Sequence, residues 1–309
     1  MKPLIPMFYF PLKILFVDDD NDLLESYHHL DLSNNIATES DPYKAIEALT
    51  QNHVGMIKIF DDITDEQNID ALTTDNESVV KFTFKNIQTF MNNDDKYNKY
   101  GIVVVDYKMP EMNGIELCNQ INSKIDIIKI LLTGEYKPLD ALTAVNENRV
   151  DNYIPKGKPT TFNDLVITIN ALQLKYFINA TKNYCGLLEN KFDFLFDTAF
   201  AELINSFITN YNIVEYYLLS NTGSFLMKNK TDSFIINTYT DKDLDVFCDM
   251  YEHIDHSLLD KVKSRQLIPN FKIPKNIQIS DYFYPATKFG QYYYHLSKIE
   301  DTQFLQGVI

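Results

Sequence analysis

The stretch of residues 101–114, GIVVVDYKMPEMNG, constrains the fold of this chain more than any other. An apolar, mostly β-branched run leads directly into Asp106, which is typical of a buried strand in a parallel sheet. Asp106 is therefore expected at the carboxyl edge of that sheet, where open α/β sheets hold their ligands. Pro110 and Gly114 mark a loop before the next helical run. An ordinary strand that ends in an exposed acid is the alternative, since a single motif match has a real false-positive risk.

Three more apolar runs end in a reactive polar side chain. The run within residues 13–22 ends in Asp18, Asp19 and Asp20. The run within residues 129–135 ends in Thr133, and the run within residues 152–159 ends in Lys156. Helical patterns separate the runs, so their carboxyl ends are expected to meet at one edge of a single sheet. The sequence thus predicts an α/β domain with a parallel sheet.

These residues resemble the receiver domain of bacterial two-component response regulators. The resemblance assigns each residue a role: Asp18 and Asp19 are the acidic pair, Asp106 is the phosphoacceptor in its DxxMPxMxG setting, Thr133 is the switch hydroxyl, Lys156 is the active-site lysine and Tyr153 is the switch aromatic. It also implies a doubly wound, parallel, five-stranded sheet of the flavodoxin-like kind. The chain is then expected to be a signalling protein rather than an enzyme, with a sensor histidine kinase or phosphotransfer protein as its partner.

A magnesium ion is the expected cofactor. Three clustered carboxylates repel one another unless a hard cation neutralises them, and Mg²⁺ with oxygen ligands and retained waters suits such a site. The resemblance implies Asp19, Asp106 and the backbone carbonyl of Lys108 as ligands, with Asp18 acting mainly through water. In phosphoryl transfer the protein mostly positions groups and spreads charge, so Asp106 is expected to attack in line while Lys156 and the metal neutralise the phosphoryl oxygens.

The chain departs from this family in two places. Asp19 and Asp106 are 87 positions apart, about twice the usual interval, and the excess lies in an insertion of about residues 53–100. The second apolar patch of the insertion favours a packed helix, on the spacing of Val80, Phe84, Ile87 and Met91. The second departure is Gly157, which stands where the family usually has proline directly after the lysine, so that Lys158 competes with Lys156 for the active-site role.

The length of 309 residues suggests about two domains. We expect a receiver domain over residues 1–160, a connecting helix over 161–190 and an α+β output domain with a small antiparallel sheet over 191–309. In the output domain, a helical stripe is expected at Phe192, Phe196, Phe200, Leu203 and Phe207, followed by a β-hairpin with Gly223 in its turn and a helix capped by Thr240.

The charge balance disfavours broad attraction to nucleic acid or anionic membrane. The net charge is −15, and residues 1–159 hold 15 Lys or Arg against 26 Asp or Glu, while the remainder holds 13 against 17. Pro3, Pro6 and Pro11 interrupt the apolar start of the chain, which favours an ordered arm over a signal peptide. No apolar run of about 18 residues occurs, and the three widely spaced cysteines favour reduced thiols, so we expect a cytoplasmic protein without a membrane partner.

The second half also resembles a poorly characterised C-terminal domain attached to some proteobacterial receivers. The resemblance rests on LLSNTGSFLM, TDKDLDVFCDMY, LIPNF and YPATKFGQYYYHL, and with the receiver insertion it points to the Lqs-type response regulators of α-hydroxyketone quorum sensing. His253 and His256 have helical spacing but no third ligand, so surface histidines are the better interpretation. We expect output by protein interaction, with dimerisation on phosphorylation; the alternative is a transcription regulator that binds nucleic acid through the C-terminal domain.

Overall fold

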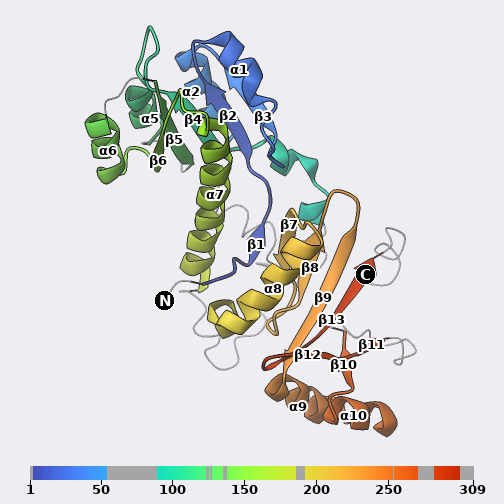
Figure 1. Ribbon diagram of the computed structural model, residues 1–309. Helices are drawn as coiled ribbons and strands as arrows, with labels where there is room; N and C mark the ends of the chain where they lie inside the picture. Colours follow the sequence, from blue (N-terminus) through green and yellow to red (C-terminus); the bar gives the residue numbers. More distant parts are fainter. Residues whose placement is uncertain are drawn as a thin grey trace. The chain divides into compact units, whose positions relative to one another are not determined.

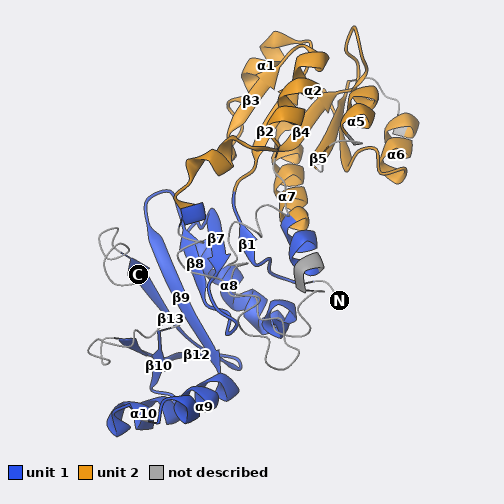
Figure 2. Ribbon diagram, turned by 180° about the vertical axis from the view of Figure 1, so that it is seen from behind, with its two compact units in different colours: residues 1–10, 60–90, 177–309 blue, residues 11–59, 91–176 orange. Residues whose placement is uncertain are grey.

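The computed structural model contains two compact units (Figure 2). Residues 11–59 and 91–176 form one, here named the parallel unit, and residues 1–10, 60–90 and 177–309 form the other, the antiparallel unit. The structure describes residues 3–53, 89–122, 125, 127–134, 138–185, 192–252, 254–270 and 282–299. This division differs from consecutive halves, because residues 1–10 group with the C-terminal part of the chain.

The parallel unit is built on a five-stranded sheet (Figure 1). Its strands are β2 (Lys13–Val17), β3 (Ile36–Glu39), β4 (Tyr100–Asp106), β5 (Ile128–Thr133) and β6 (Asn152–Pro155). Their order is β3-β2-β4-β5-β6 and every neighbouring pair is parallel. This is the flavodoxin-like order, which reverses between β2 and β4 and leaves a crevice at their carboxyl ends. The predicted fold class is confirmed.

Helices cover both faces of this sheet. They are α1 (Asn21–Tyr27), α2 (Pro42–Gln51), α5 (Gly114–Asn122), α6 (Pro138–Asn146) and α7 (Thr161–Cys185). Val103 and Val105 of β4 share a core with residues of α2, α5 and α6, whereas Phe16 of β2 stacks on Tyr27 of α1. Because successive side chains of a strand point to opposite faces, β4 is buried along its whole length.

The predicted insertion leaves and rejoins the sheet at neighbouring points. His53 forms a parallel bridge with Tyr100, and the Tyr100 NH donates to the Asn52 carbonyl at 2.8 Å. The insertion therefore adds chain without separating β2 from β4. The helix predicted from Val80, Phe84 and Ile87 lies outside the described residues; near the end of the segment the structure has a 3-10 helix, η2 (Asp94–Asn98).

The antiparallel unit has a six-stranded sheet of order β1-β7-β8-β9-β13-β12. The strands are β1 (Phe8–Tyr9), β7 (Glu215–Leu218), β8 (Phe225–Lys228), β9 (Ser233–Thr240), β13 (Tyr292–Ile299) and β12 (Thr287–Phe289). A second sheet pairs β10 (Leu267–Pro269) with β11 (Phe283–Pro285), and the helices are α8 (Thr198–Asn210), α9 (Asp241–Met250) and α10 (His256–Lys263). The predicted α+β unit with an antiparallel sheet is confirmed, but its first strand comes from the N-terminal arm.

Local signals explain several of these elements and correct one prediction. Gly223, in the turn between β7 and β8, has a φ of 97°, a left-handed conformation that favours glycine. Thr240 forms a complete capping box with Asp243 at the start of α9. The single helix expected from Phe192 to Phe207 is wrong, because a 3-10 turn, η3 (Asp193–Phe196), ends before Asp197, whose side chain caps α8 by accepting from the Phe200 NH at 2.8 Å.

The cysteines that the structure describes are reduced, as expected from the sequence. Cys118 and Cys248 are buried free thiols, and burial raises the pKa of the Cys118 thiol to about 12, as suits a structural role. The Cys185 side chain and His253 lie outside the described part of the chain. Among the helices that the structure describes, none combines the length and apolar character needed to cross a membrane.

Candidate functional site

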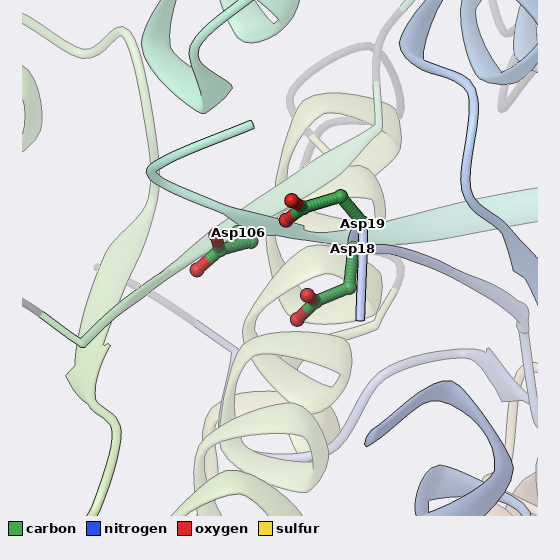
Figure 3. Close-up of side chains that lie close together, drawn as sticks. All are labelled: Asp18, Asp19 and Asp106. Atoms are coloured by element: carbon green, nitrogen blue, oxygen red, sulfur yellow. The ribbon is translucent and has the colours of Figure 1, made fainter. Parts of the chain in front are cut away.

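The polar strand ends predicted from the sequence meet at one edge of the parallel sheet. Asp18 and Asp19 directly follow β2, Asp106 ends β4, and Thr133 ends β5. Lys156 directly follows β6, and its NH donates to the Thr133 carbonyl at 2.7 Å. One carboxylate oxygen from each of the three acids lies within 4.8 Å of the others (Figure 3).

Lys156 is the cation of this site. Its Nζ lies 2.6 Å from Asp18 Oδ2 and 2.6 Å from Asp106 Oδ1, so one ammonium group joins two buried carboxylates. Asp18 is 1% exposed and Asp106 6% exposed. Lys158, the competing candidate, is exposed, and its backbone NH donates to Thr161 Oγ1 instead.

Burial and pairing act in opposite directions on these charges. Burial raises the pKa of the Asp106 carboxyl, even though Lys156 and the backbone NH of Lys108 favour its charged form. Burial also opposes the charge on Lys156, but its hydrogen bonds to Asp106 and Asp18 outweigh this and raise its pKa. Lys156 therefore stays an ammonium, while burial makes the ionised form of Asp106 less favourable than it is in water.

The loop after β4 holds Asp106 closely. The Lys108 NH donates to Asp106 Oδ2 at 3.1 Å, and the Gly114 NH donates to the Tyr107 carbonyl at 3.0 Å. A Cβ atom on Gly114 would lie 2.3 Å from the Asp106 carbonyl oxygen, too close for any side chain. The glycine that marked the loop in the sequence is thus required by the close approach of two backbone segments.

The donor set fits a magnesium ion. Asp18, Asp19 and Asp106 offer hard carboxylate oxygens, and Asp19 is exposed, which suits a metal that keeps several waters. Three carboxylates and one ammonium leave a surplus of two negative charges, which a divalent cation cancels. The carbonyl of Lys108 stays a predicted ligand, beside an NH group that already contacts Asp106.

The two predicted switch residues lie on neighbouring strands. Thr133 is 7% exposed at the end of β5. Tyr153 of β6 is half-buried, pairs with Leu131 of β5 and packs against the core cluster that contains Leu131. Their positions are compatible with the switch roles that the resemblance implies, and those roles stay predictions.

The sequence analysis missed one residue of this site, Tyr27. It is the last residue of α1 and is 2% exposed, and its ring stacks on Phe16 of β2. Burial, with the nearby charges of Asp18 and Asp106, raises the pKa of Tyr27 well above its usual value. A tyrosine on the buried face of the first helix was the available signal, but spacing alone does not say where its hydroxyl lies.

Comparison with known proteins agrees with this geometry. Residues 57–170 match the family model described as response regulator receiver domain. The Legionella pneumophila response regulator LqsR is 25% identical, with 97% of this chain and 91% of that chain covered and a TM-score of 0.72. An adenylate cyclase from Rhodopirellula baltica (20% identity, 58% and 99% covered, TM-score 0.38) and a receiver domain protein from Clostridium thermocellum (22%, 57% and 98%, 0.32) are also similar.

No curated protein matches the chain. The family match begins at residue 57 and therefore does not include Asp18 and Asp19. In the structure β2 and β4 are neighbouring strands, so Asp18 and Asp19 still lie in the same site as Asp106. The chain therefore carries the receiver domain of a two-component response regulator.

Proposed function

We propose that the chain is a response regulator of a phosphorelay that accepts a phosphoryl group on Asp106 from a sensor histidine kinase or phosphotransfer protein. The observation that supports this most directly is the ammonium of Lys156, 2.6 Å from both Asp18 Oδ2 and Asp106 Oδ1. A carboxylate oxygen of Asp106 attacks the phosphorus of a phosphohistidine in line; the P–N bond breaks and its electron pair stays on the histidine nitrogen. Lys156 then pairs with the oxygens of the new acyl phosphate.

The acids hold the cofactor of this reaction. Oxygens of Asp19 and Asp106, with Asp18 through water and the Lys108 carbonyl, form the proposed magnesium site. When bound, Mg²⁺ supplies neutralisation of the charge on the phosphoryl oxygens. Asp106 is thereby relieved of repulsion from the other carboxylates and kept free of its proton.

The output is proposed to be a change in association rather than a catalytic step. The phosphoryl group attracts the Thr133 hydroxyl, Tyr153 turns inward, and the face formed by residues 138–184 changes. Leu139 and Leu142 of α6 are 75% and 46% exposed, so an apolar part of this face is available to a second copy of the chain. The likeness to LqsR supports a role in quorum sensing.

The phosphoacceptor is tested by labelling. With Mg²⁺ and a small acyl phosphate as donor, the wild-type chain should incorporate phosphate, and Asp106→Asn should reduce labelling to background, because an amide is not a nucleophile for this step. Asp20→Asn is the matched control, since Asp20 is exposed and caps α1, and asparagine caps a helix equally well. Labelling of Asp106→Asn at the wild-type level would place the acceptor elsewhere.

The output is tested by light scattering over a range of concentrations. The phosphoryl mimic trifluoroberyllate, with Mg²⁺, should raise the mean mass of the wild-type chain and leave that of Asp106→Asn unchanged. A preference of ~1.4 kcal/mol for the associated form is enough for a tenfold shift of the equilibrium constant. Identical masses with and without the mimic would contradict output by dimerisation.

A further inference from the structure

Thr161, the first residue of α7, holds both ends of the turn that carries Lys156. Its hydroxyl donates to the Pro155 carbonyl at 3.0 Å, and the same oxygen accepts from the Lys158 NH at 3.1 Å. The Thr161 NH donates in turn to the Lys158 carbonyl at 3.0 Å. Both partners of the hydroxyl precede Thr161 in the chain, so this side chain acts on the turn that leads into the helix.

The peptide unit between Pro155 and Lys156 is held at both of its polar ends. Its carbonyl accepts from the Thr161 hydroxyl, and its NH donates to the Thr133 carbonyl of β5 at 2.7 Å. A peptide unit is planar and does not rotate internally, so bonds at its two ends fix its orientation. The bond from this unit to the Cα atom of Lys156 is thereby fixed as well, and the bond to the Lys158 NH limits the rotation beyond it.

The residue after Lys156 gives the turn little rigidity of its own. Gly157 is in the left-handed region, and glycine restrains its backbone less than any other residue. The proline that the family usually has at this place would fix its own φ. In this chain a hydroxyl that bridges residues 155 and 158 supplies the restraint from outside the turn.

The position of the Lys156 ammonium requires such a restraint. Its Nζ lies 2.6 Å from Asp18 Oδ2 and 2.6 Å from Asp106 Oδ1, so it must reach both oxygens at once. A lysine side chain is a flexible four-carbon stem, so a small change at its base displaces the charge at its end. In enzymes, a misplacement of about 1 Å can lower a rate on the order of 100-fold.

We propose that Thr161 is a positioning residue that directs the Lys156 ammonium to the acidic site and thereby speeds phosphoryl transfer to Asp106. The first part concerns the Lys156 side chain alone. The second part rests on the proposed function of Asp106.

Thr161→Val tests the second part, because valine keeps the branched shape and lacks the hydroxyl. In labelling with a small acyl phosphate and Mg²⁺, an Asp106 oxygen forms the new P–O bond, and the donor's P–O bond breaks with its electron pair on the released carboxylate. This step should be about tenfold slower in Thr161→Val. Thr161→Ser should restore most of the wild-type rate, because serine supplies the hydroxyl again. A wild-type rate for Thr161→Val would overturn the second part.

Thr160→Val is the matched control. Thr160 is the exposed neighbour of Thr161, and its hydroxyl donates to Asp164 Oδ2 at 2.9 Å instead of to the turn. Its labelling rate should equal that of the wild type. An equal loss in Thr160→Val and Thr161→Val would assign the effect to the start of α7 in general and would overturn the proposal.

A double-mutant cycle separates positioning from support of the fold. In a Lys156→Ala background, Thr161→Val should slow the residual labelling less than about twofold, because the ammonium that the hydroxyl directs is gone. The same loss in both backgrounds would show a structural role and would overturn the proposal. Thermal melting of each variant identifies any loss that comes from unfolding.

NMR of the full chain tests the first part without a phosphoryl donor. With ¹³C at the lysine Cε atoms, the two Hε atoms of a fixed side chain give separate signals, whereas those of a mobile one average; Lys156→Arg identifies the signals. The wild type, Thr161→Ser and Thr160→Val should show the separation, and Thr161→Val should lose it. Separate signals in Thr161→Val, or averaged signals in the wild type, would overturn the positioning role. If the wild-type chain is not labelled at all, the proposed function of Asp106 fails instead, and the spectra still decide the role of Thr161.

Discussion

Asp106 is the residue at which the stability of the fold and the proposed phosphoacceptor role oppose each other. Its carboxylate is almost completely buried beside Asp18, and burial raises its pKa. A group whose pKa is higher in the folded than in the unfolded state stabilises the fold in its protonated form. That contribution is complete below the unfolded pKa and is lost as the pH rises through the folded pKa. At neutral pH without Mg²⁺, the ionised Asp106 therefore costs stability.

The raised pKa of Asp106 predicts how the melting temperature changes when its charge is removed. In the absence of Mg²⁺ at pH 7, Asp106→Asn should raise the melting temperature, by about 2–4 °C for each kcal/mol of relief. The gain should shrink as the pH is lowered through the raised pKa of Asp106, because the wild-type carboxyl then becomes neutral as well. Saturating Mg²⁺ should also remove most of the gain by stabilising the wild-type site. Equal melting temperatures at pH 7 without the metal would show that Lys156 fully compensates for burial.

At the scale of single elements, the turn after β6 places a left-handed residue directly after Lys156. Gly157 has a φ of 81°, in the left-handed region, and nothing lies within 4 Å of the position that a Cβ atom would take. Proline, which the family usually has at this place, is locked near −65° and is incompatible with this backbone. The departure from the family pattern at Gly157 thus reflects a different local conformation directly beside the site.

Gly157→Pro is therefore expected to damage the site. It should reduce the free energy of unfolding by more than about 1 kcal/mol and slow the labelling of Asp106, because the backbone beside Lys156 must be rebuilt. Gly157→Asn is the control, since asparagine tolerates positive φ better than most residues and has open space here. Chemical denaturation and labelling rates measure both effects. Wild-type behaviour of the proline variant would mean that the turn rearranges without moving Lys156.

At the scale of the whole molecule, the N-terminal arm belongs to the C-terminal sheet. Phe8 of β1 pairs with Tyr217 of β7, is 1% exposed and meets the ring of Phe177 edge-on at 5.6 Å. The same chain continues directly into β2, which ends at Asp18 and Asp19. The strand that leads to the acidic site is thus preceded by a strand of the antiparallel unit, with only residues 10–12 between them.

Phe8→Ala tests the place of the arm. Truncation of a buried phenylalanine typically costs about 3–5 kcal/mol, and here the cost should fall on the antiparallel unit. Hydrogen exchange should become faster in residues 215–218 and stay unchanged in residues 100–106. Leu4→Ala is the control, because the Leu4 side chain is 44% exposed. Faster exchange in both regions, or in neither, would contradict this assignment.

The sequence by itself determined which strands form the parallel sheet and which side chains meet at its edge. Asp18, Asp106, Thr133 and Lys156 each end an apolar run, and parallel strands bring such ends together whatever the helices between them contain. The turn at Gly223 and the cap at Thr240 were also predictable, because each depends on residues within a few positions. The functional roles of the site residues stay predictions.

Only the tertiary structure decided the contacts between residues that no local pattern relates. The pairing of β1 with β7, the stacking of Tyr27 on Phe16 and the pairing of Lys156 rather than Lys158 with the acids each depend on how distant segments pack. The stripe from Phe192 to Phe207 was misread for a local reason, since Asp197 hydrogen-bonds the backbone and starts the helix later than hydrophobic spacing suggests. Periodicity reports which face of an element is buried, but only packing decides which atoms meet there.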